Sequence, residues 1–314
     1  MYRIGIDLGG TFIKGGIVRD KTDIIYKTKI ETPLSHTPGD TCEAINELVT
    51  MLRNNLATGP DECEFIGIGS PGSVDSETGT VMYSNNFYWE RPVKLAEAVS
   101  SHQKIPVRIS NDANCAALGE CLSNNLDKGT YIVITLGTGV GSGIITDGKI
   151  YEGAHAGAIE MGHMMIRYGK RKCTCGMRGC FEAYCSATGL IKTAVKNLKK
   201  GSGLYNAYKE NGSLDGKMIT DLVRAGDNNT KKVFDRYLTD LGIGLTGIAN
   251  VFRPDTILLG GGVCESFDLM DDFLNDFVRN NIFGQENGFV PVIKKASTGN
   301  DAGIIGAANL AGDL

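Results

Sequence analysis

The sequence predicts a two-domain α/β protein, and three features of the chain support this fold class. Its 314 residues exceed the roughly 100 to 200 residues of a typical single domain. Short β-rich runs alternate with amphipathic helical segments along the chain. A strand, a glycine-rich turn and a second strand occur at the start and again 128 residues later. We therefore expect two similar halves with a cleft between them.

The internal repeat becomes visible when the chain is compared with itself at an offset of 128 residues (135 − 7). The matched positions in the first segment are Ile4, Ile6, Leu8, Gly9, Gly15 and Ile17, and their partners are Ile132, Ile134, Leu136, Gly137, Gly143 and Ile145. Strand–turn–strand patterns are common, so six matches alone leave chance as an alternative. The bolder interpretation is that each half offers one turn to a shared phosphate group, because glycine lets the backbone approach a ligand closely.

Each element of the first half has its own signal in the sequence. After the first hairpin we expect a third strand over residues 23–30, followed by a helix over 39–56 whose apolar residues recur on one face. Residues 64–69 form the next predicted strand, which ends before a Pro-Gly break. A further strand over 106–110 leads directly into a helix over 112–122.

The second half opens with the repeated hairpin at residue 130 and continues through an irregular loop rich in glycine and cysteine. The pattern then becomes strongly helical from residue 186 to 252. A strand over 256–259 runs into three consecutive glycines, and a last helix begins near residue 301.

The domain boundary is expected at residue 122, where the last helix of the first half ends. We predict an N-terminal α/β domain of residues 1–122, completed by the C-terminal helix at about 299–314. Residues 123–298 would form a C-terminal α/β domain with the cysteine-rich loop and a helical insertion.

Composition and charge exclude several classes of function. Hydrophobic residues make up 42% and charged residues 22% of the chain, as in ordinary globular proteins. The net charge is −4 and no dense Lys/Arg run occurs, which argues against a nucleic-acid partner or an anionic membrane partner. The first residues lack the pattern of a signal peptide, and the longest apolar stretch, residues 131–145, is interrupted and too short to span a membrane. We therefore expect a cytoplasmic protein.

The first motif with chemical meaning is Asp7-Leu8-Gly9-Gly10-Thr11. A carboxylate at the end of a strand can hold a hydrated Mg²⁺, while the following amides and hydroxyl donate to phosphate oxygens. An ordinary hairpin turn is the alternative, although the similar turn at residues 136–141 favours the phosphate interpretation. The motif is not a P-loop, because no Gly-Lys-Ser/Thr follows it.

The second motif is Asn111-Asp112-Ala113-Asn114, where a predicted strand ends and a helix begins. The simplest role of Asp112 is a helix cap, which contributes about 1 kcal/mol. The same carboxylate would also face a cleft at the carboxyl end of a strand, where open α/β sheets bind ligands. There it could accept the proton of an attacking hydroxyl, as the base does in phosphoryl transfer.

The third motif combines His163 with Cys173, Cys175 and Cys180. One imidazole and three thiolates satisfy tetrahedral Zn²⁺, and four protein ligands are typical of a structural zinc site. Unmetallated core thiols are the alternative. Because the loop has no periodic apolar face, we expect metal coordination to supply its order.

Two acidic residues, Glu160 and Glu182, flank these ligands and could accept hydrogen bonds from a polyhydroxylated substrate. A pair of solvated surface acids is the alternative. Residues 83–89 (the lip) combine amides and aromatic rings and include the only Trp. The lip has the composition of a sugar-binding loop, but a buried aromatic cluster fits that composition equally well.

Together these motifs resemble the ROK family (repressors, open reading frames, sugar kinases), and they follow the order found in that family. The resemblance covers almost the whole chain and rests on the segments Asp7–Thr11, Pro71-Gly72, Asn111–Ala117, Gly137–Gly141, Glu160–His163, Cys173–Cys180 and Gly260–Gly262. It implies an actin-like, ribonuclease-H-like ATPase fold and ATP-dependent phosphorylation of the 6-hydroxyl of a hexose. The closest likeness is to bacterial glucokinases, and a homodimer is usual in the family.

The resemblance also implies roles for individual residues. Asp112 would be the catalytic base, Asp7 would lie near Mg²⁺, and His163 would contact the sugar with one ring nitrogen while the other binds zinc. The other sugar-contacting residues would be Asn86, Asn111, Glu160 and Glu182. The ATP phosphates would be surrounded by Gly9, Gly10, Thr11, Gly137, Thr138 and Gly139, and the adenosine would be bordered by Gly260, Gly261 and Gly262. Asn85 stands where many relatives have Pro, which leaves open whether Asn85 or Asn86 contacts the sugar.

Other functions within the family stay open. The hexose could be N-acetylglucosamine, N-acetylmannosamine, fructose, mannose or allose instead of glucose, and a non-catalytic sugar-sensing protein is a further alternative. A transcriptional repressor of the family would carry a helix-turn-helix ahead of the first glycine turn, and only six residues precede Asp7.

Overall fold

A computed structural model of the chain describes residues 2–56, 59, 62–84, 86–154, 157 and 159–312. Its contacts group into two compact units. The first unit consists of Met1–Tyr131, Gly143–Ile159 and Ser297–Leu314, and the second consists of Ile132–Ser142 and Glu160–Ala296. These units are groups of residues in contact, whereas a domain is a part of the chain that folds as a unit. The predicted domain boundary at residue 122 therefore stays a prediction.

The first five-stranded sheet has the order β3-β2-β1-β4-β7. Its strands are β1 (Tyr2–Leu8), β2 (Phe12–Arg19), β3 (Asp23–Glu31), β4 (Cys63–Ser70) and β7 (Val107–Asn111). The first three strands form an antiparallel meander, whereas β4 and β7 run parallel to β1. The carboxyl ends of β1, β4 and β7 therefore lie at one edge of the sheet, here called the carboxyl edge.

The second five-stranded sheet has the order β10-β9-β8-β11-β12. Its strands are β8 (Thr130–Leu136), β9 (Val140–Thr146), β10 (Lys149–Ile150), β11 (Thr256–Gly260) and β12 (Val292–Lys295). Both sheets place a meander of three strands beside two parallel strands, and β8 begins and ends 128 residues after β1. The internal repeat predicted from the sequence is therefore confirmed by the topology.

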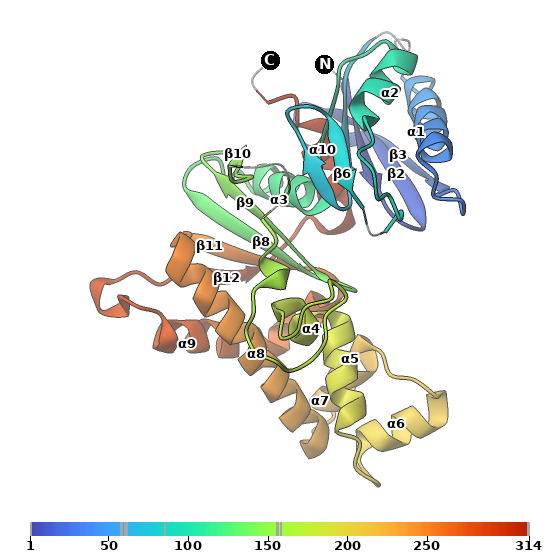
Figure 1. Ribbon diagram of the computed structural model, residues 1–314. Coiled ribbons are helices and arrows are strands. Elements are labelled where there is room, and N and C mark those ends of the chain that lie inside the picture. The colour runs from blue at the N-terminus through green and yellow to red at the C-terminus, as the bar shows by residue number, and fades with distance from the viewer. Residues whose placement is uncertain are drawn as a thin grey trace. The chain divides into compact units, whose positions relative to one another are not determined.

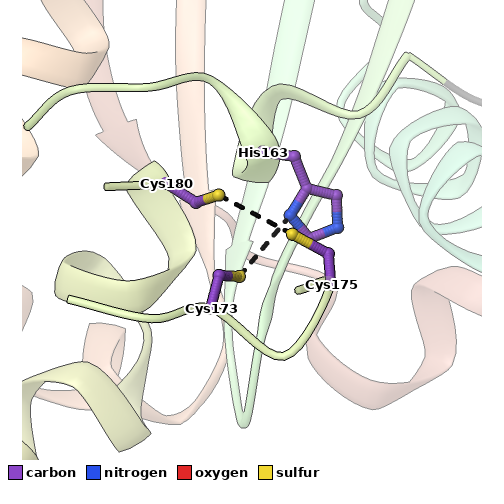
Figure 2. Close-up of side chains that lie close together, drawn as sticks. All are labelled: His163, Cys173, Cys175 and Cys180. Carbon is purple, nitrogen blue, oxygen red and sulfur yellow. Dashed lines mark hydrogen bonds between the residues drawn. The ribbon is translucent and has the colours of Figure 1, made fainter. Parts of the chain in front are cut away.

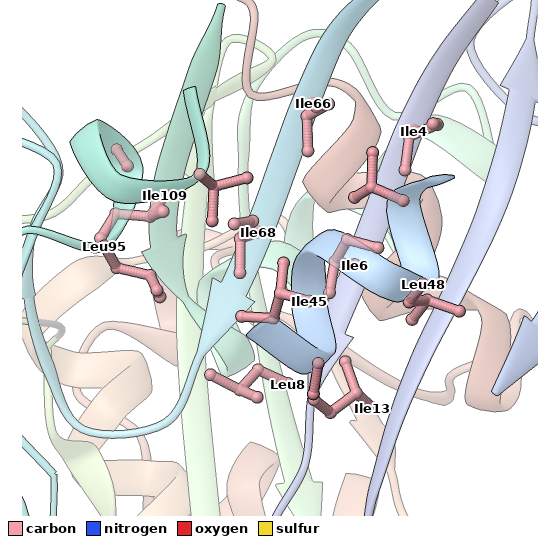
Figure 3. Packing of buried hydrophobic residues seen from close by; sticks show 14 of the residues in the cluster. Ile4, Ile6, Leu8, Ile13, Ile45, Leu48, Ile66, Ile68, Leu95 and Ile109 are labelled. Atoms are coloured by element: carbon pink, nitrogen blue, oxygen red, sulfur yellow. The ribbon is translucent and has the colours of Figure 1, made fainter. Parts of the chain in front are cut away.

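Helices cover both faces of the first sheet (Figure 1). One face is covered by α1 (Pro38–Arg53) and α2 (Leu95–Gln103), and the other by α3 (Asp112–Ser123) and α10 (Ala302–Ala308). On the first face, isoleucines of β1 and β4 pack against the apolar stripe of α1 to form the core shown in Figure 3. On the other face, a Cβ at Gly67 would lie 1.7 Å from the carbonyl oxygen of Ala307, so only glycine permits this close approach of α10.

The helical region predicted over 186–252 is confirmed as four successive helices. They are α5 (Ala187–Lys196), α6 (Gly203–Asn211), α7 (Gly216–Arg224) and α8 (Asn228–Phe252), and a short α4 (Phe181–Cys185) precedes them. The 3₁₀ segments in the described part of the chain include η2 (Met161–His163), η3 (Gly262–Leu269), η4 (Gln285–Asn287) and η5 (Gly299–Asp301). A bilayer crossing would need a longer apolar helix than any in the described part of the chain.

Several elements were not predicted from the sequence. Besides β10 and α4, they include α2, α9 (Asp271–Asn281), β12 and a small hairpin of β5 (Ser73–Asp75) and β6 (Thr80–Tyr83). Strands β5, β6 and β12 have only three or four residues each, too few for a period of two to stand out from chance. Helices α2 and α9 contain few apolar residues, so their buried faces are narrow.

Candidate functional site

The turn at residues 9–11 follows β1 at the carboxyl edge of the first sheet. Its amides are not equally available, because the Gly9 N–H already donates to the Phe12 carbonyl at 3.1 Å. Gly10 and Thr11 are exposed. Of the three residues predicted to surround phosphate, Gly10 and Thr11 are therefore the better placed donors.

Asp7, predicted to lie near Mg²⁺, is half-buried at the end of β1, and Lys14 Nζ lies 3.1 Å from its Oδ2. It is backed by α10, where a Cβ at Gly303 would lie 3.5 Å from the Asp7 carboxyl carbon. A carboxylate oxygen is a ligand type that Mg²⁺ prefers, so Asp7 suits the predicted ion.

Asp112 is the first residue of α3, and its neighbour Asn111 is the helix cap. Asn111 Oδ1 accepts from the amides of Ala113 at 2.9 Å and Asn114 at 3.3 Å. The N-cap position thus belongs to Asn111, one residue earlier than predicted, while Asp112 Oδ1 also accepts from the Ala113 amide at 2.8 Å; the role of Asp112 as a base stays a prediction. The Asp112 carboxylate is half-buried at the carboxyl edge.

Asn111 also forms a hydrogen bond with Gly72, in the segment that connects β4 to β5. Its Nδ2 donates to the Gly72 carbonyl at 3.1 Å, so both ends of the buried amide already have protein partners. We conclude that Asn111 fixes the junction of β7 and α3, which sets the position of Asp112.

Glu152 is a residue at this junction that sequence reasoning missed. Its carboxylate accepts from the Ser110 hydroxyl at 2.8 Å and from Asn114 Nδ2 at 3.5 Å, and it also binds the Ser76 hydroxyl. Glu152 follows a two-residue strand and belongs to no motif, so nothing in the sequence could have indicated this role.

Cys115 lies in the first turn of α3, and its thiol pKa depends on the negative charges around the junction. Burial raises the pKa of this thiol well above its ordinary value, and the nearby carboxylates of Asp112, Asp7 and Glu152 raise it further. The thiol therefore stays protonated at neutral pH, and it is not a candidate nucleophile.

The lip, residues 83–89, divides its side chains between the core and the solvent. Ser84 and Trp89 pair through two backbone hydrogen bonds of 3.1 and 3.0 Å and close a tight loop. Phe87 and Trp89 are buried in the core, whereas Asn86 and Tyr88 are exposed. The buried aromatic cluster is therefore confirmed for Phe87 and Trp89, whereas sugar binding by the lip stays a prediction, and Asn85 lies outside the described residues.

The turn at residues 137–139, which connects β8 to β9, is held by the helices that follow the cysteine-rich loop. The Gly137 N–H donates to the Gly139 carbonyl at 3.0 Å, so this amide is engaged within the turn. The Gly137 carbonyl accepts from the Ala187 amide at 2.8 Å, and the Thr138 carbonyl accepts from the Thr188 hydroxyl at 2.9 Å. The turn is thus a rigid element that can present Thr138 and Gly139 to a phosphate.

The three glycines at 260–262 follow β11 and lead into η3. Gly261 has a φ of 90°, and a Cβ there would lie 2.5 Å from the Leu136 carbonyl oxygen. Since Leu136 precedes the turn at 137–139, this glycine lets the end of β11 pack directly against that turn. The contact with adenosine stays a prediction.

The four predicted zinc ligands lie together, and their ligand atoms are all within 4.8 Å of one another (Figure 2). The sulfurs of Cys175 and Cys180 are 3.7 Å apart, and Cys173 Sγ lies 3.8 Å from His163 Nδ1. A tetrahedral ion with Zn–S bonds of about 2.3 Å separates its sulfurs by about 3.8 Å, so the cluster fits zinc. Nδ1 faces the thiols, which leaves Nε2 of His163 for another partner.

Contacts other than metal also order the cysteine-rich loop. Arg167 Nε donates to the buried Asp240 carboxylate at 2.7 Å. Arg171 donates to the carbonyls of Ala183 at 2.7 Å and Gly189 at 3.1 Å, and its guanidinium lies over the ring of Tyr184. The expectation that coordination alone supplies the order of the loop is therefore wrong, because two arginines anchor the loop to the helices.

Glu182 connects this loop with the turn at 137–139. Its Oε2 accepts from the Val140 amide at 3.1 Å, while its Oε1 accepts from the Thr174 hydroxyl at 2.8 Å and the Cys173 thiol at 3.2 Å. A Cβ at Gly139 would lie 2.5 Å from the same carboxylate. Glu182 is thus more than a solvated surface acid.

Glu160 is an exposed residue directly before η2. Partial desolvation of its carboxyl raises the pKa of that group; the His163 ring counteracts this rise, and Glu182 adds to it. A partly desolvated carboxylate gains from each hydrogen bond that a ligand donates to it, which suits an acceptor of sugar hydroxyls.

Comparison with known proteins supports a sugar kinase. A model of the ROK family matches residues 3–313. The glucokinase of Thermotoga maritima is 31% identical over 310 residues, which cover 98% of this chain and 96% of that protein. The xylose repressor of Bacillus subtilis is 29% identical over 312 residues, which cover 98% of this chain and 76% of the repressor.

A similar solved structure is that of a ROK family glucokinase from Streptomyces griseus in complex with glucose and AMPPNP. It is 32% identical to this chain, each chain is covered to 99%, and the TM-score is 0.80. Because the family model spans almost all residues and these relatives align along nearly the whole chain, the protein belongs to the ROK family and has its actin-like ATPase fold.

Proposed function

We propose that the protein is an ATP-dependent hexose kinase that transfers the γ-phosphate of ATP to the 6-hydroxyl of a hexose, with glucose as the first candidate. The observation that carries the proposal is the position of Asp112, a carboxylate at the carboxyl edge whose junction is fixed by the neighbouring Asn111 cap. The glucokinase relatives, and the glucose and AMPPNP bound by the related glucokinase, support the same reaction.

In the proposed reaction, Asp112 accepts the proton of the sugar 6-hydroxyl as its oxygen attacks the γ-phosphorus. The new bond joins that oxygen to phosphorus, and the bond between phosphorus and the oxygen of the leaving ADP breaks. The phosphate oxygens carry the negative charge in the transition state. The backbone amides of Gly10, Thr11, Thr138 and Gly139 and the Thr11 hydroxyl would donate hydrogen bonds to them. Fixed donors of this kind need little reorganisation during the reaction.

Two metal ions belong to the proposal. Asp7 would hold Mg²⁺, which neutralises phosphate charge when bound, and His163 with the three cysteines would hold structural Zn²⁺. The role of this chain's own residues at the zinc site is to fix the imidazole so that Nε2 of His163 can contact the sugar.

A panel of hexoses tests the proposed function. We expect ADP release in a coupled assay to depend on added hexose, with the highest kcat/KM for glucose. N-acetylglucosamine, N-acetylmannosamine, fructose, mannose and allose complete the panel, and a preference for one of them would replace glucose without changing the reaction class. ATP turnover that ignores every sugar would overturn the kinase proposal and leave a non-catalytic sugar sensor as the remaining candidate.

Two conservative variants separate the roles of the acidic residues. Glu160→Gln should raise KM for the hexose by about 10-fold and leave KM for ATP unchanged, because a charged acceptor of sugar hydroxyls becomes neutral. Glu182→Gln should raise both constants, since Glu182 also bonds to Val140 beside the turn at 137–139. Steady-state kinetics with each substrate varied in turn measures both effects, and equal effects of Glu160→Gln on both substrates would contradict its assignment to the sugar.

A further inference from the structure

Tyr88 and His36 form an exposed pair of aromatic rings beside the lip. Their ring centroids are 6.3 Å apart with an interplanar angle of 20°, and Tyr88 is 81% exposed. His36 in turn packs against the buried ring of Phe87 with centroids 5.1 Å apart. The outer face of Tyr88 is therefore open to solvent, while the core supports the stack from behind.

Both residues of the pair have a backbone conformation that favours glycine. The φ angles are 56° for Tyr88 and 49° for His36, in the left-handed region. Large side chains rarely occupy this region, because Cβ then crowds the backbone. Two strained residues whose rings stack on each other point to a function for the rings, since a glycine at either position would avoid the strain.

The aromatic pair lies at the carboxyl edge of the first sheet. The His36 carbonyl accepts from Trp89 Nε1 at 2.7 Å, and four residues before His36 the Thr32 hydroxyl donates to the Gly9 carbonyl at 2.7 Å. The pair is therefore connected to the turn that is proposed to bind phosphate.

The lip is also packed against the junction that carries Asp112. A Cβ at Gly72 would lie 2.2 Å from the Tyr83 carbonyl oxygen, so the lip rests directly on Gly72. The Gly72 carbonyl accepts from Asn111, the residue before Asp112. Two separate series of contacts thus connect the segments that carry the aromatic pair with the turn at residues 9–11 and with the junction of β7 and α3.

We propose that Tyr88, supported by His36, is a stacking platform for the acceptor hexose and determines specificity among sugars. The inference rests on the proposed function. A hexose ring has faces rich in C–H groups, which pack favourably on the electron-rich face of an aromatic ring. Asn86, exposed two residues earlier in the same tight loop, offers the amide groups that sugar hydroxyls need.

The variant Tyr88→Gly tests the platform without disturbing the fold. It removes the ring and at the same time relieves the left-handed strain, so the melting temperature should stay equal or rise. We expect Kd and KM for the preferred hexose to rise about 2- to 10-fold, as for the loss of one aromatic contact, with KM for ATP unchanged. Tyr88→Phe keeps the ring and should keep wild-type values.

A matched control is Lys104→Gly. Lys104 is another non-glycine residue of the first unit with a left-handed φ, 59°, and it ends α2. The substitution relieves the same kind of strain and should leave hexose binding unchanged. The comparison separates the effect of the ring from the effect of the backbone.

Hexose binding is measured by calorimetry without nucleotide, so the platform is tested independently of turnover. Unchanged hexose affinity in Tyr88→Gly would overturn the inference, as would equal losses for hexose and ATP. A change of oligomeric state in size-exclusion chromatography would show instead that the ring contacts a second copy of the chain. Hexose binding that weakens in Tyr88→Gly, in a protein without hexose-dependent turnover, would support the platform while the kinase proposal fails.

Discussion

Replacing Asp112 with Asn is expected to lower kcat by about 10² to 10⁴-fold, the usual cost of losing a general base. Asn has nearly the same shape but cannot accept the proton of the attacking hydroxyl at neutral pH. The fold should survive, because Asn111 is the N-cap of α3 and the amide oxygen of the substituted side chain can still accept from the Ala113 amide, as Asp112 Oδ1 does. KM for the hexose and for ATP should therefore stay close to wild type, and steady-state kinetics at saturating substrate measures the effect.

The matched control for this variant is Asp20→Asn. Asp20 is an exposed acid in the turn between β2 and β3 with a φ of 49°, a conformation that Asn also tolerates. The same change of charge and shape at this position should leave kcat unaltered. Wild-type turnover by Asp112→Asn would remove Asp112 from the mechanism.

The second large effect is expected from Cys175→Ala, which removes one of the four candidate zinc ligands. We expect stoichiometric zinc to be lost in elemental analysis, since structural sites need all four ligands. Without the ion, His163 loses the bond that orients its ring, and Nε2 no longer points reliably at the sugar. Loss of one strong hydrogen bond corresponds to about 10- to 100-fold in hexose affinity.

Nucleotide binding should be largely retained in Cys175→Ala. The turn at 137–139 is held by contacts to Ala187 and Thr188, which lie outside the cysteine-rich loop and do not require the metal. Calorimetry with a non-hydrolysable ATP analogue measures this arm of the experiment.

Cys42→Ala serves as the control, because Cys42 is half-buried in α1 and belongs to no cluster of ligands among the residues that the structure describes. It should keep both its zinc and its hexose affinity. Protein purified without chelator that contains no zinc would contradict the metal assignment. Full hexose affinity in zinc-free Cys175→Ala would show that the ion does not support the sugar site.

Local patterns in the sequence were sufficient for much of this protein. The spacing of His163 and the three cysteines predicted a cluster that the fold brings within ligand distance. The hairpin repeat predicted two sheets of the same order, because alternating apolar residues and glycine turns specify strands from short range. The junction at Asp112 could be predicted because a strand signal and a helix signal meet there.

Only the tertiary structure shows which residues of each motif are engaged in internal hydrogen bonds and which remain available to a ligand. The cap of α3 falls on Asn111, the Gly9 and Gly137 amides are engaged within their turns, and Glu182 reaches the Val140 amide. In the same way, Glu152, which belongs to no sequence motif, accepts a hydrogen bond from Ser110 at the junction of β7 and α3.

The stacking of His36 on Tyr88 depends on the same kind of contact, which joins residues 52 positions apart (88 − 36). Hydrophobic periodicity and turn chemistry act over a few residues, so they specify the elements and their order. Hydrogen bonds and ring contacts between distant segments form only after those elements pack, and they depend on distances and angles that no local pattern encodes. For this reason the sequence determined the family's motifs, whereas packing decided which side chains remain available to a ligand.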